Sequence, residues 1–259
     1  MTENNTKNAI NIVCIIYEDN IDYIKTTLFS LIINKEQNIQ YNIYCLTEIE
    51  YSFDFLRRIN NHVSIKQINL NKIFNEYNIR NKENFKYNCI YYLDQILPEV
   101  KRIIYINHEI IFKKSLQDIW KINLENDQYI ACIGGFNREI YTNLILIDLL
   151  KIRKQDLNYD YIIRMKSENL HKKDIINELK DHIKILSFKY LTPNINEIQN
   201  YYLYNGSTIK AKIDYINEIN NSLCLCYVKK PWEHHYVLFG DIWKQYYKEC
   251  IYIENLKLN

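Results

Sequence analysis

Short apolar runs that stop abruptly at polar residues alternate with segments of helical periodicity in the first part of the chain. The run Ile10–Tyr17 ends at Glu18-Asp19-Asn20, and apolar residues then recur at helical spacing over residues 23–33. The same pairing recurs over residues 41–59, and a third run covers residues 63–70. This alternation favours an open, doubly wound α/β sheet. Ligands of such sheets bind beyond the carboxyl ends of the strands, so the loop at residues 18–20 is the first candidate site.

The middle of the chain repeats the pattern with clear stops. A predicted helix over residues 85–97 ends at Pro98, because neither proline nor the residue before it continues a helix readily. The predicted strand Arg102–Ile106 then stops at Asn107-His108-Glu109, and an apolar run over residues 142–150 leads into a basic helix. The polar segment Asn107-His108-Glu109 is therefore another candidate for a loop beside a ligand.

The bulk composition limits the domain count and the partners. No linker rich in proline, glycine or serine interrupts the chain, so we expect a single domain over residues 1–259, with residues 1–9 as a polar extension. The net charge is +2, from 33 basic and 31 acidic residues. Such a balance predicts no general attraction to nucleic acid.

The cysteines and the apolar runs indicate a cytoplasmic protein. The seven cysteines form no C-x-x-C pair, and most lie inside apolar runs, which is typical of reduced, buried thiols. The start of the chain is polar, unlike a signal peptide. No uncharged apolar run reaches the roughly 18 residues of a membrane span, so any membrane association is expected to be peripheral.

Five segments, in order along the chain, resemble landmarks of family 8 glycosyltransferases. Residues 97–112 with Leu116-Gln117-Asp118-Ile119-Trp120 resemble the family's Y-L-D-x-D strand, apolar pair and D-L-x-x-L-W segment. Ile12–Asn20 takes the place of its first strand and acidic donor-binding loop. The other three matches are Tyr141–Leu149 to N-S-G-V-L-L-I-N-L, Asp174–Asn177 to the end of D-Q-D-x-x-N, and Cys226–Trp232 to H-Y-x-G-x-K-P-W.

The resemblance implies a fold and an activity. The fold would be GT-A, a Rossmann-like mixed but mostly parallel sheet flanked by helices. The activity would be transfer of a hexose from a UDP-sugar to a surface-glycan or lipid-linked acceptor, with retention. At the donor-binding positions of the family this chain has Asp19, Asn107, Glu109 and Lys230, and in the segment expected to face the transferred sugar it has Lys172, Lys173 and Asp174.

The same comparison shows that the family's metal ligands are changed. The family holds Mn²⁺ or Mg²⁺ with the two D-x-D carboxylates and a histidine, and the cation neutralises the diphosphate leaving group. Here Asn107 and Glu109 stand at the D-x-D positions, and Cys226, or Leu225 if the register shifts by one, stands at the histidine position. Lys172 and Lys173 replace the first two residues of D-Q-D.

Three accounts of this altered site remain open. In the first, Glu109 with Asn107 holds a metal, helped by His108 or by His234-His235. In the second, the site is metal-independent and lysines among 172, 173, 229 and 230 supply the positive charge. In the third, the chain is a catalytically inactive pseudo-glycosyltransferase that acts as a binding or scaffold protein. A nucleotide-binding α/β protein unrelated to sugars is a further alternative.

Overall fold

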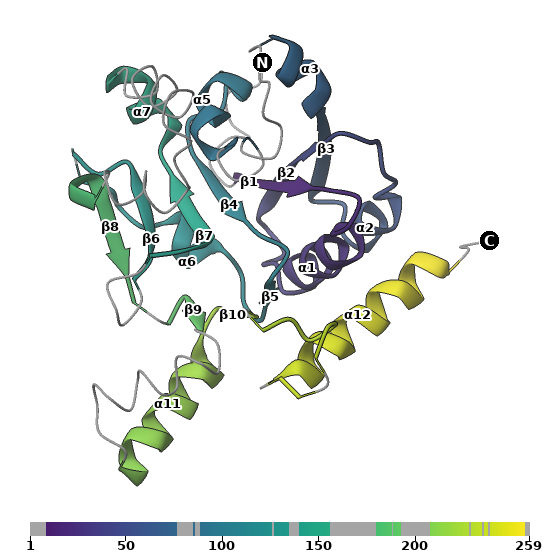
Figure 1. Cartoon of the computed structure of the whole chain (residues 1–259), viewed down its shortest axis with the longest axis vertical. Coiled ribbons are helices and arrows are strands. Elements are labelled where there is room, and N and C mark those ends of the chain that lie inside the picture. The colour runs from purple at the N-terminus through teal and green to yellow at the C-terminus, as the bar shows by residue number, and fades with distance from the viewer. Residues whose placement is uncertain are drawn as a thin grey trace.

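The computed structural model describes residues 9–76, 85, 89–125, 127–134, 140–155, 180–187, 189–192, 208–227, 229–234, 236–237 and 239–256. Its main feature is a seven-stranded sheet in the order β3-β2-β1-β4-β7-β6-β8 (Figure 1). The strands are β1 Ala9–Ile16, β2 Gln40–Thr47, β3 Val63–Asn69, β4 Ile103–Ile106, β6 Ile130–Gly134, β7 Ile140–Ile147 and β8 Ile183–Leu186. Strand β7 runs antiparallel to both of its neighbours, and the remaining pairs are parallel. The mixed, mostly parallel sheet confirms the predicted fold class.

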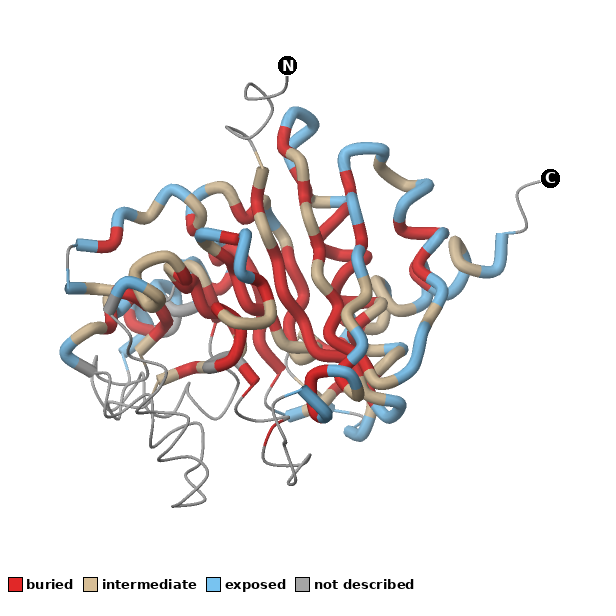
Figure 2. The backbone as a smooth tube through the Cα atoms, turned by 90° about the horizontal axis from the view of Figure 1, so that it is seen from above, coloured by how far each residue is buried: buried red, intermediate tan, exposed pale blue. Residues whose placement is uncertain are grey.

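The central strand β1 explains why the apolar runs do not alternate with polar residues. It pairs with β2 along its whole length at one edge and with β4 at the other edge, and its two faces pack in two separate hydrophobic clusters. Ile12 and Ile16 pack with the buried residues of the first helix, whereas Val13 and Ile15 pack in a second cluster on the opposite face. A strand covered on both faces is apolar throughout. Figure 2 shows the buried residues concentrated in these central strands.

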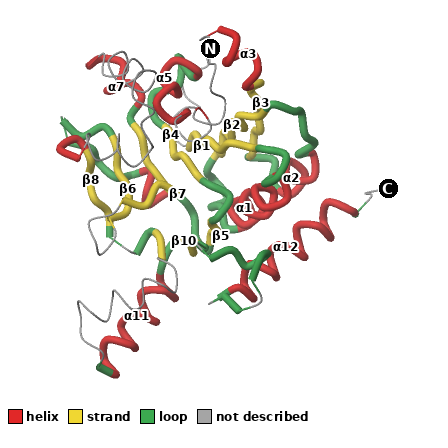
Figure 3. Tube along the Cα trace, in the orientation of Figure 1, coloured by secondary structure: helices red, strands yellow, loops and turns green. Residues whose placement is uncertain are grey.

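Helices cover the two faces of the sheet (Figure 3). The face that carries Ile12 is covered by α1 Ile21–Ile33, α2 Asp54–Ile59, α6 Gln117–Trp120 and α12 Gly240–Asn255. The opposite face is covered by α3 Leu70–Glu76, the 3₁₀ helix η1 Cys89–Tyr92, α5 Leu93–Ile96 and α7 Leu149–Gln155. The remaining helices in the described part of the chain are η2 Lys180–His182 and α11 Ile209–Asn221, and α11 projects away from the sheet in Figure 1. In the described part of the chain, no helix combines the length and apolar character that crossing a membrane requires.

The predicted strands match the structure to within one residue in the first half of the chain, but the helix predicted over residues 85–97 is different. Within it, residues 89–96 form a 3₁₀ turn followed by a single α-helical turn. Leu97, which precedes Pro98, has φ −123° and ψ 60°, outside the helical region. The proline excludes that region for its predecessor, so the predicted stop is correct although the helix before it is short.

A second, three-stranded sheet begins where β4 ends. Its order is β5-β10-β9, with β5 Ile110–Phe112, β10 Cys224–Cys226 and β9 Leu191–Thr192. Strand β10 runs antiparallel to β5 and parallel to β9. The chain therefore leaves the main sheet after Ile106 and enters the small sheet at Ile110. The three residues between them, Asn107-His108-Glu109, form a link between the two sheets.

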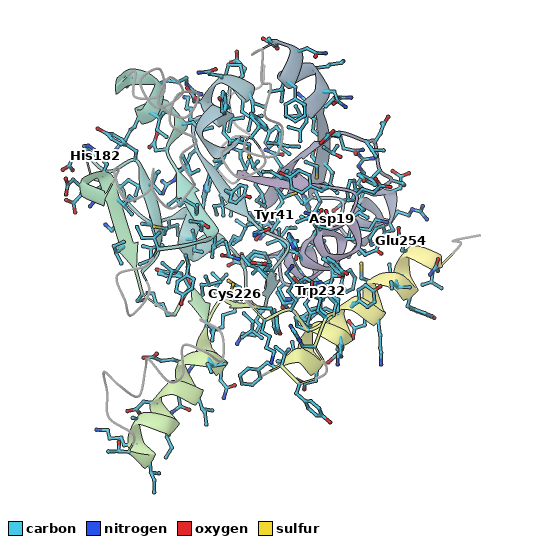
Figure 4. The ribbon with its side chains drawn as sticks, in the orientation of Figure 1. Asp19, Tyr41, His182, Cys226, Trp232 and Glu254 are labelled. Atoms are coloured by element: carbon cyan, nitrogen blue, oxygen red, sulfur yellow. The ribbon has the colours of Figure 1, made fainter. Side chains whose placement is uncertain are left out.

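The C-terminal helix α12 lies along α1 (Figures 1 and 4). Lys25 on α1 forms an ion pair with Glu254 at 2.5 Å. At the other end of α1, the Asn34 side-chain amide lies 3.1 Å from the Tyr246 hydroxyl and 3.0 Å from the carbonyl oxygen of Phe112 in β5. These contacts join the end of the chain to the first helix, so the segment just before α12 has a fixed place beside α1.

The side chain of Thr27 on α1 anchors the link between the sheets. Thr27 is fully buried, and its hydroxyl lies 3.0 Å from the carbonyl oxygen of His108 and 2.8 Å from that of Ile110. The first carbonyl belongs to the link itself, and the second belongs to Ile110, the first residue of β5. A buried carbonyl left without a donor costs about 1–3 kcal/mol.

We expect Thr27→Val to lower the free energy of unfolding by about 1–3 kcal/mol, because valine keeps the shape of threonine but removes the donor. Thr26→Val is the matched control, since Thr26 is equally buried but its hydroxyl bonds Asp22 O within α1. The helix itself bonds that carbonyl, so the control should lose less than about 1 kcal/mol. Urea unfolding of the two variants measures the difference, and equal losses would contradict the anchoring role.

Candidate functional site

A cavity of about 610 Å³ lies at the carboxyl ends of β1 and β4. Its lining comes from four places: the ends of these two strands, the start of α1, β7, and the turn before α12. The lining residues are Ile15, Tyr17, Asp19, Asn20, Tyr23, Tyr105, Asn107, His108, Glu109, Thr142, Lys230, Trp232 and Glu233. Four residues singled out from the sequence, Asp19, Asn107, Glu109 and Lys230, thus share one cavity.

The loop after β1 is a tight turn that Asn20 holds from inside. The Asn20 side-chain oxygen accepts a hydrogen bond from the Tyr17 N–H at 2.8 Å, and the Asn20 N–H donates to the Tyr17 carbonyl at 3.1 Å. Asn20 is buried, whereas Asp19 beside it is exposed. The turn therefore leaves the Asp19 side chain exposed at the edge of the cavity that it lines.

Asn143 of β7 contacts both ends of the link after β4. The Asn107 N–H donates to the Asn143 carbonyl at 2.9 Å, and the Asn143 side-chain amide donates to a Glu109 carboxylate oxygen at 2.6 Å. Within the link, the Asn107 side-chain oxygen accepts the His108 N–H at 2.8 Å. Both positions that correspond to the D-x-D carboxylates are therefore engaged in hydrogen bonds of the protein itself.

His108, between these two positions, is a neutral side chain at ordinary pH. Burial and the positive charge of Lys230 lower the pKa of His108 from 6.5 to about 4, against the opposing effect of Asp19. Because the Asn20 side-chain oxygen is bound to Tyr17, the Asn20 amide nitrogen faces His108 Nδ1 at 3.5 Å. An amide nitrogen only donates, so Nδ1 is the acceptor and the proton of the neutral ring resides on Nε2.

The turn before α12 carries two of the lining residues, Lys230 and Glu233. The N–H groups of Glu233 and His234 both donate to the Lys230 carbonyl at 3.1 Å, and the Lys230 ammonium lies 3.3 Å from a Glu233 carboxylate oxygen. Between them, Trp232 stacks on Tyr23 of α1 with ring centroids 4.1 Å apart. Trp243 of α12 lies 5.0 Å from the Trp232 ring. The turn is thus fixed between the first and the last helix.

The described lining of the cavity has more negative than positive charge. It contains three carboxylates, those of Asp19, Glu109 and Glu233, and one ammonium group, that of Lys230. His108 adds no charge at ordinary pH because its pKa is about 4. An anionic ligand that enters the cavity therefore depends strongly on Lys230.

The described residues show no preformed cluster of several protein ligands for a divalent metal. They contain no group of three or more histidine, cysteine, aspartate or glutamate residues placed to hold one ion. Cys226, at the position of the family's histidine, is buried in β10 opposite Ile110, and burial together with the charge of Glu109 raises the pKa of its thiol. A protonated thiol is a poor ligand for hard cations such as Mg²⁺ or Mn²⁺. Glu109 is left as the one anionic candidate ligand among Asn107, Glu109 and Cys226.

Several sequence candidates lie outside the described residues. These are Lys172, Lys173, Asp174 and His235. Conversely, the structure adds residues that sequence reasoning did not assign to the site, namely Tyr23, Asn143 and Glu233. Glu233 follows Lys230-Pro231-Trp232 directly in the sequence. This proximity to a predicted binding residue could have indicated that Glu233 also belongs to the site.

The lowered pKa of His108 predicts a pH dependence of stability. Because the folded-state pKa lies below 6.5, the unfolded chain binds more protons between pH 6.5 and about 4. The associated stability is complete above pH 6.5 and is lost as the pH falls toward 4, by on the order of 3 kcal/mol. We expect His108→Gln to lose less stability than the wild type between pH 7 and pH 4 in urea unfolding.

The matched control is His62→Gln, since His62 is exposed in the loop before β3. It should follow the wild-type pH dependence. If His108→Gln also follows it, His108 is not the neutral, buried group that the structure indicates.

Comparison with known proteins supports the fold. No protein-family model and no curated protein matches this chain. Among solved structures, the bifunctional glycosyltransferase WbbM is similar with a TM-score of 0.76 and 12% identity, over 98% of this chain and 52% of WbbM. Glycosyltransferase GlyE of Streptococcus pneumoniae TIGR4 follows with 0.69 and 18%, over 95% of this chain and 63% of GlyE.

A third neighbour matches over nearly its whole length. It is the galactosyltransferase LgtC, solved with donor and acceptor sugar analogues, with a TM-score of 0.64 and 14% identity over 93% of this chain and 96% of LgtC. This chain therefore spans about half of WbbM and less than two thirds of GlyE. At these identities the likeness concerns the backbone arrangement, and the chain has the GT-A fold that these glycosyltransferases share.

Proposed function

We propose that this chain is a glycosyltransferase that binds a UDP-sugar in the cavity and transfers the hexose to a surface-glycan or lipid-linked acceptor, with retention. The observation that carries the proposal is the convergence of Asp19, Glu109 and Lys230 in one cavity at the carboxyl ends of β1 and β4. Sheets of this type bind ligands at that edge. The glycosyltransferases with the same fold, one of them solved with donor and acceptor analogues, support the choice of ligand class.

In this proposal Lys230 contacts the diphosphate. The bond between the sugar and the diphosphate breaks with a gain of negative charge on the leaving group, and a fixed ammonium group stabilises that charge. The wall opposite the turn offers hydrogen-bonding groups from Asn107, Glu109 and Thr142, which suit the hydroxyl groups of a sugar. In the same proposal Asp19, which also lines the cavity, contacts the nucleoside.

The negative lining raises a question of charge balance. A diphosphate brings further negative charge to a cavity with three carboxylates and one ammonium group. Either a divalent cation enters together with the nucleotide, or lysines such as Lys172 and Lys173 supply the balance. The two accounts differ in whether Mn²⁺ strengthens nucleotide binding.

A specific observation favours the second candidate function, an inactive pseudo-glycosyltransferase. The groups that would contact a ligand already bind one another, since Glu109 accepts the Asn143 amide and Lys230 pairs with Glu233. A cavity whose polar groups are already paired has less to gain from a ligand. Such a chain would keep the fold and present its surface to a partner.

Calorimetric titration of UDP, with and without Mn²⁺, tests the proposal. We expect saturable UDP binding, followed by hydrolysis of at least one UDP-sugar from a panel. Binding that is tighter with Mn²⁺ would support a cation carried in with the nucleotide, and equal binding would support lysines. UDP binding without hydrolysis would favour the pseudo-glycosyltransferase. No UDP binding with or without Mn²⁺ would contradict the proposed function.

Lys230→Ala should weaken UDP binding by about 1–3 kcal/mol, because it removes a hydrogen bond to a charged group. Lys229→Ala is the matched control, since Lys229 is exposed and is not among the cavity residues. Titration calorimetry of both variants measures the effect. If they bind UDP equally well, Lys230 does not contact the diphosphate.

A further inference from the structure

The ion pair between Lys230 and Glu233 occupies the one ammonium group found in the described lining of the cavity. Lys230 Nζ lies 3.3 Å from Glu233 Oε1, and both residues line the cavity. The side chains are 36% and 51% exposed, so water reaches both. An anion that binds Lys230 therefore meets a carboxylate already at that position.

We propose that Glu233 competes with the phosphate groups of the ligand for Lys230 and so sets the affinity and the release of the anion. This inference rests on the proposed function, because it assigns the diphosphate to Lys230. Glu233 acts as an internal counter-ion: it neutralises Lys230 in the empty cavity and turns into solvent when the anion binds.

The geometry of the turn makes this exchange local. The N–H groups of Glu233 and His234 hold the Lys230 carbonyl, and Trp232 is fixed between Tyr23 and Trp243. The backbone of the turn is thus fixed by contacts other than the ion pair. Rotation of the exposed Glu233 side chain releases the ammonium group and leaves those contacts intact.

The other carboxylates of the cavity are less suited to this role. The Glu109 carboxylate accepts the Asn143 amide at 2.6 Å, which holds it at the link after β4. Asp19 lies on the exposed turn after β1, and no ion pair joins it to Lys230 among the described residues. Glu233 is the carboxylate that shares the turn with Lys230, so its removal should change the anion affinity most directly.

The test compares Glu233→Gln with the wild type in titrations of UDP and of inorganic pyrophosphate. We expect Glu233→Gln to bind both ligands about 2- to 5-fold more tightly, the range that an exposed ion pair supports. The gain should shrink at high ionic strength, because salt screens exposed charges. In the Lys230→Ala background, Glu233→Gln should give no gain.

Asp54→Asn is the matched control. Asp54 forms an ion pair with Arg57 on α2 with the same three-residue spacing and similar exposure, and it does not line the cavity. It should leave UDP and pyrophosphate binding unchanged. Thermal unfolding of each variant checks that the fold persists.

The outcomes separate the two proposals. Unchanged or weaker binding of both ligands by Glu233→Gln, or a gain that survives Lys230→Ala, would overturn the competition. If UDP fails to bind while pyrophosphate binds and shows the Lys230-dependent gain, the nucleotide proposal fails and the competition stands. If neither ligand binds any variant, both proposals are wrong.

Discussion

The site depends on how the chain passes from one sheet to another in three residues. Strand β4 ends at Ile106 and β5 begins at Ile110, so the backbone groups of residues 107–109 lose the regular pairing of a sheet. Their partners come from three other elements: the Thr27 hydroxyl of α1, the Asn143 carbonyl of β7, and the Tyr227 N–H, which donates to the Glu109 carbonyl at 2.8 Å. Buried backbone groups must be paired, so these contacts fix the link in one conformation. That conformation places Asn107, His108 and Glu109 along the cavity.

A small number of contacts also holds the turn before α12, which carries Lys230. The turn that carries Lys230 has little regular structure, and its position follows from the Trp232 ring, which lies between Tyr23 and Trp243. The ion pair Lys25–Glu254 and the contact between Asn34 and Tyr246 join α12 to α1. The turn and the link are therefore both held in place by contacts to α1. Helix α1 therefore supports both the turn and the link, although Tyr23, in its first turn, is its one residue among the described lining of the cavity.

The parallel strands of the fold could be predicted from the sequence, whereas the contacts between elements far apart in the chain could not. Runs such as Ile10–Tyr17 are apolar throughout because both faces of a parallel sheet are covered, and the polar stops after them predict where a ligand edge lies. The placement of Asn143 opposite Asn107 could not be predicted, because it follows from the antiparallel register in which Leu144 faces Ile106. The stacking of Tyr23 on Trp232 joins residues far apart in the chain, and no local pattern encodes it. The short helix at residues 93–96 was overestimated because apolar spacing alone does not measure helix length.

At each of the three positions where the resembled family has a metal ligand, the side chain of this chain is hydrogen-bonded within the protein or is uncharged. Glutamate has one methylene more than aspartate, and the Glu109 carboxylate lies within hydrogen-bond distance of the Asn143 amide. Asn107 binds the backbone of its own link, and the Cys226 thiol carries no charge because burial raises its pKa. An aspartate restored at position 107 would give two carboxylates, at 107 and 109, but position 226 would still lack the imidazole ligand. Among the described lining residues Lys230 is the one ammonium group, and it is already paired with Glu233, one of the three carboxylates of that lining.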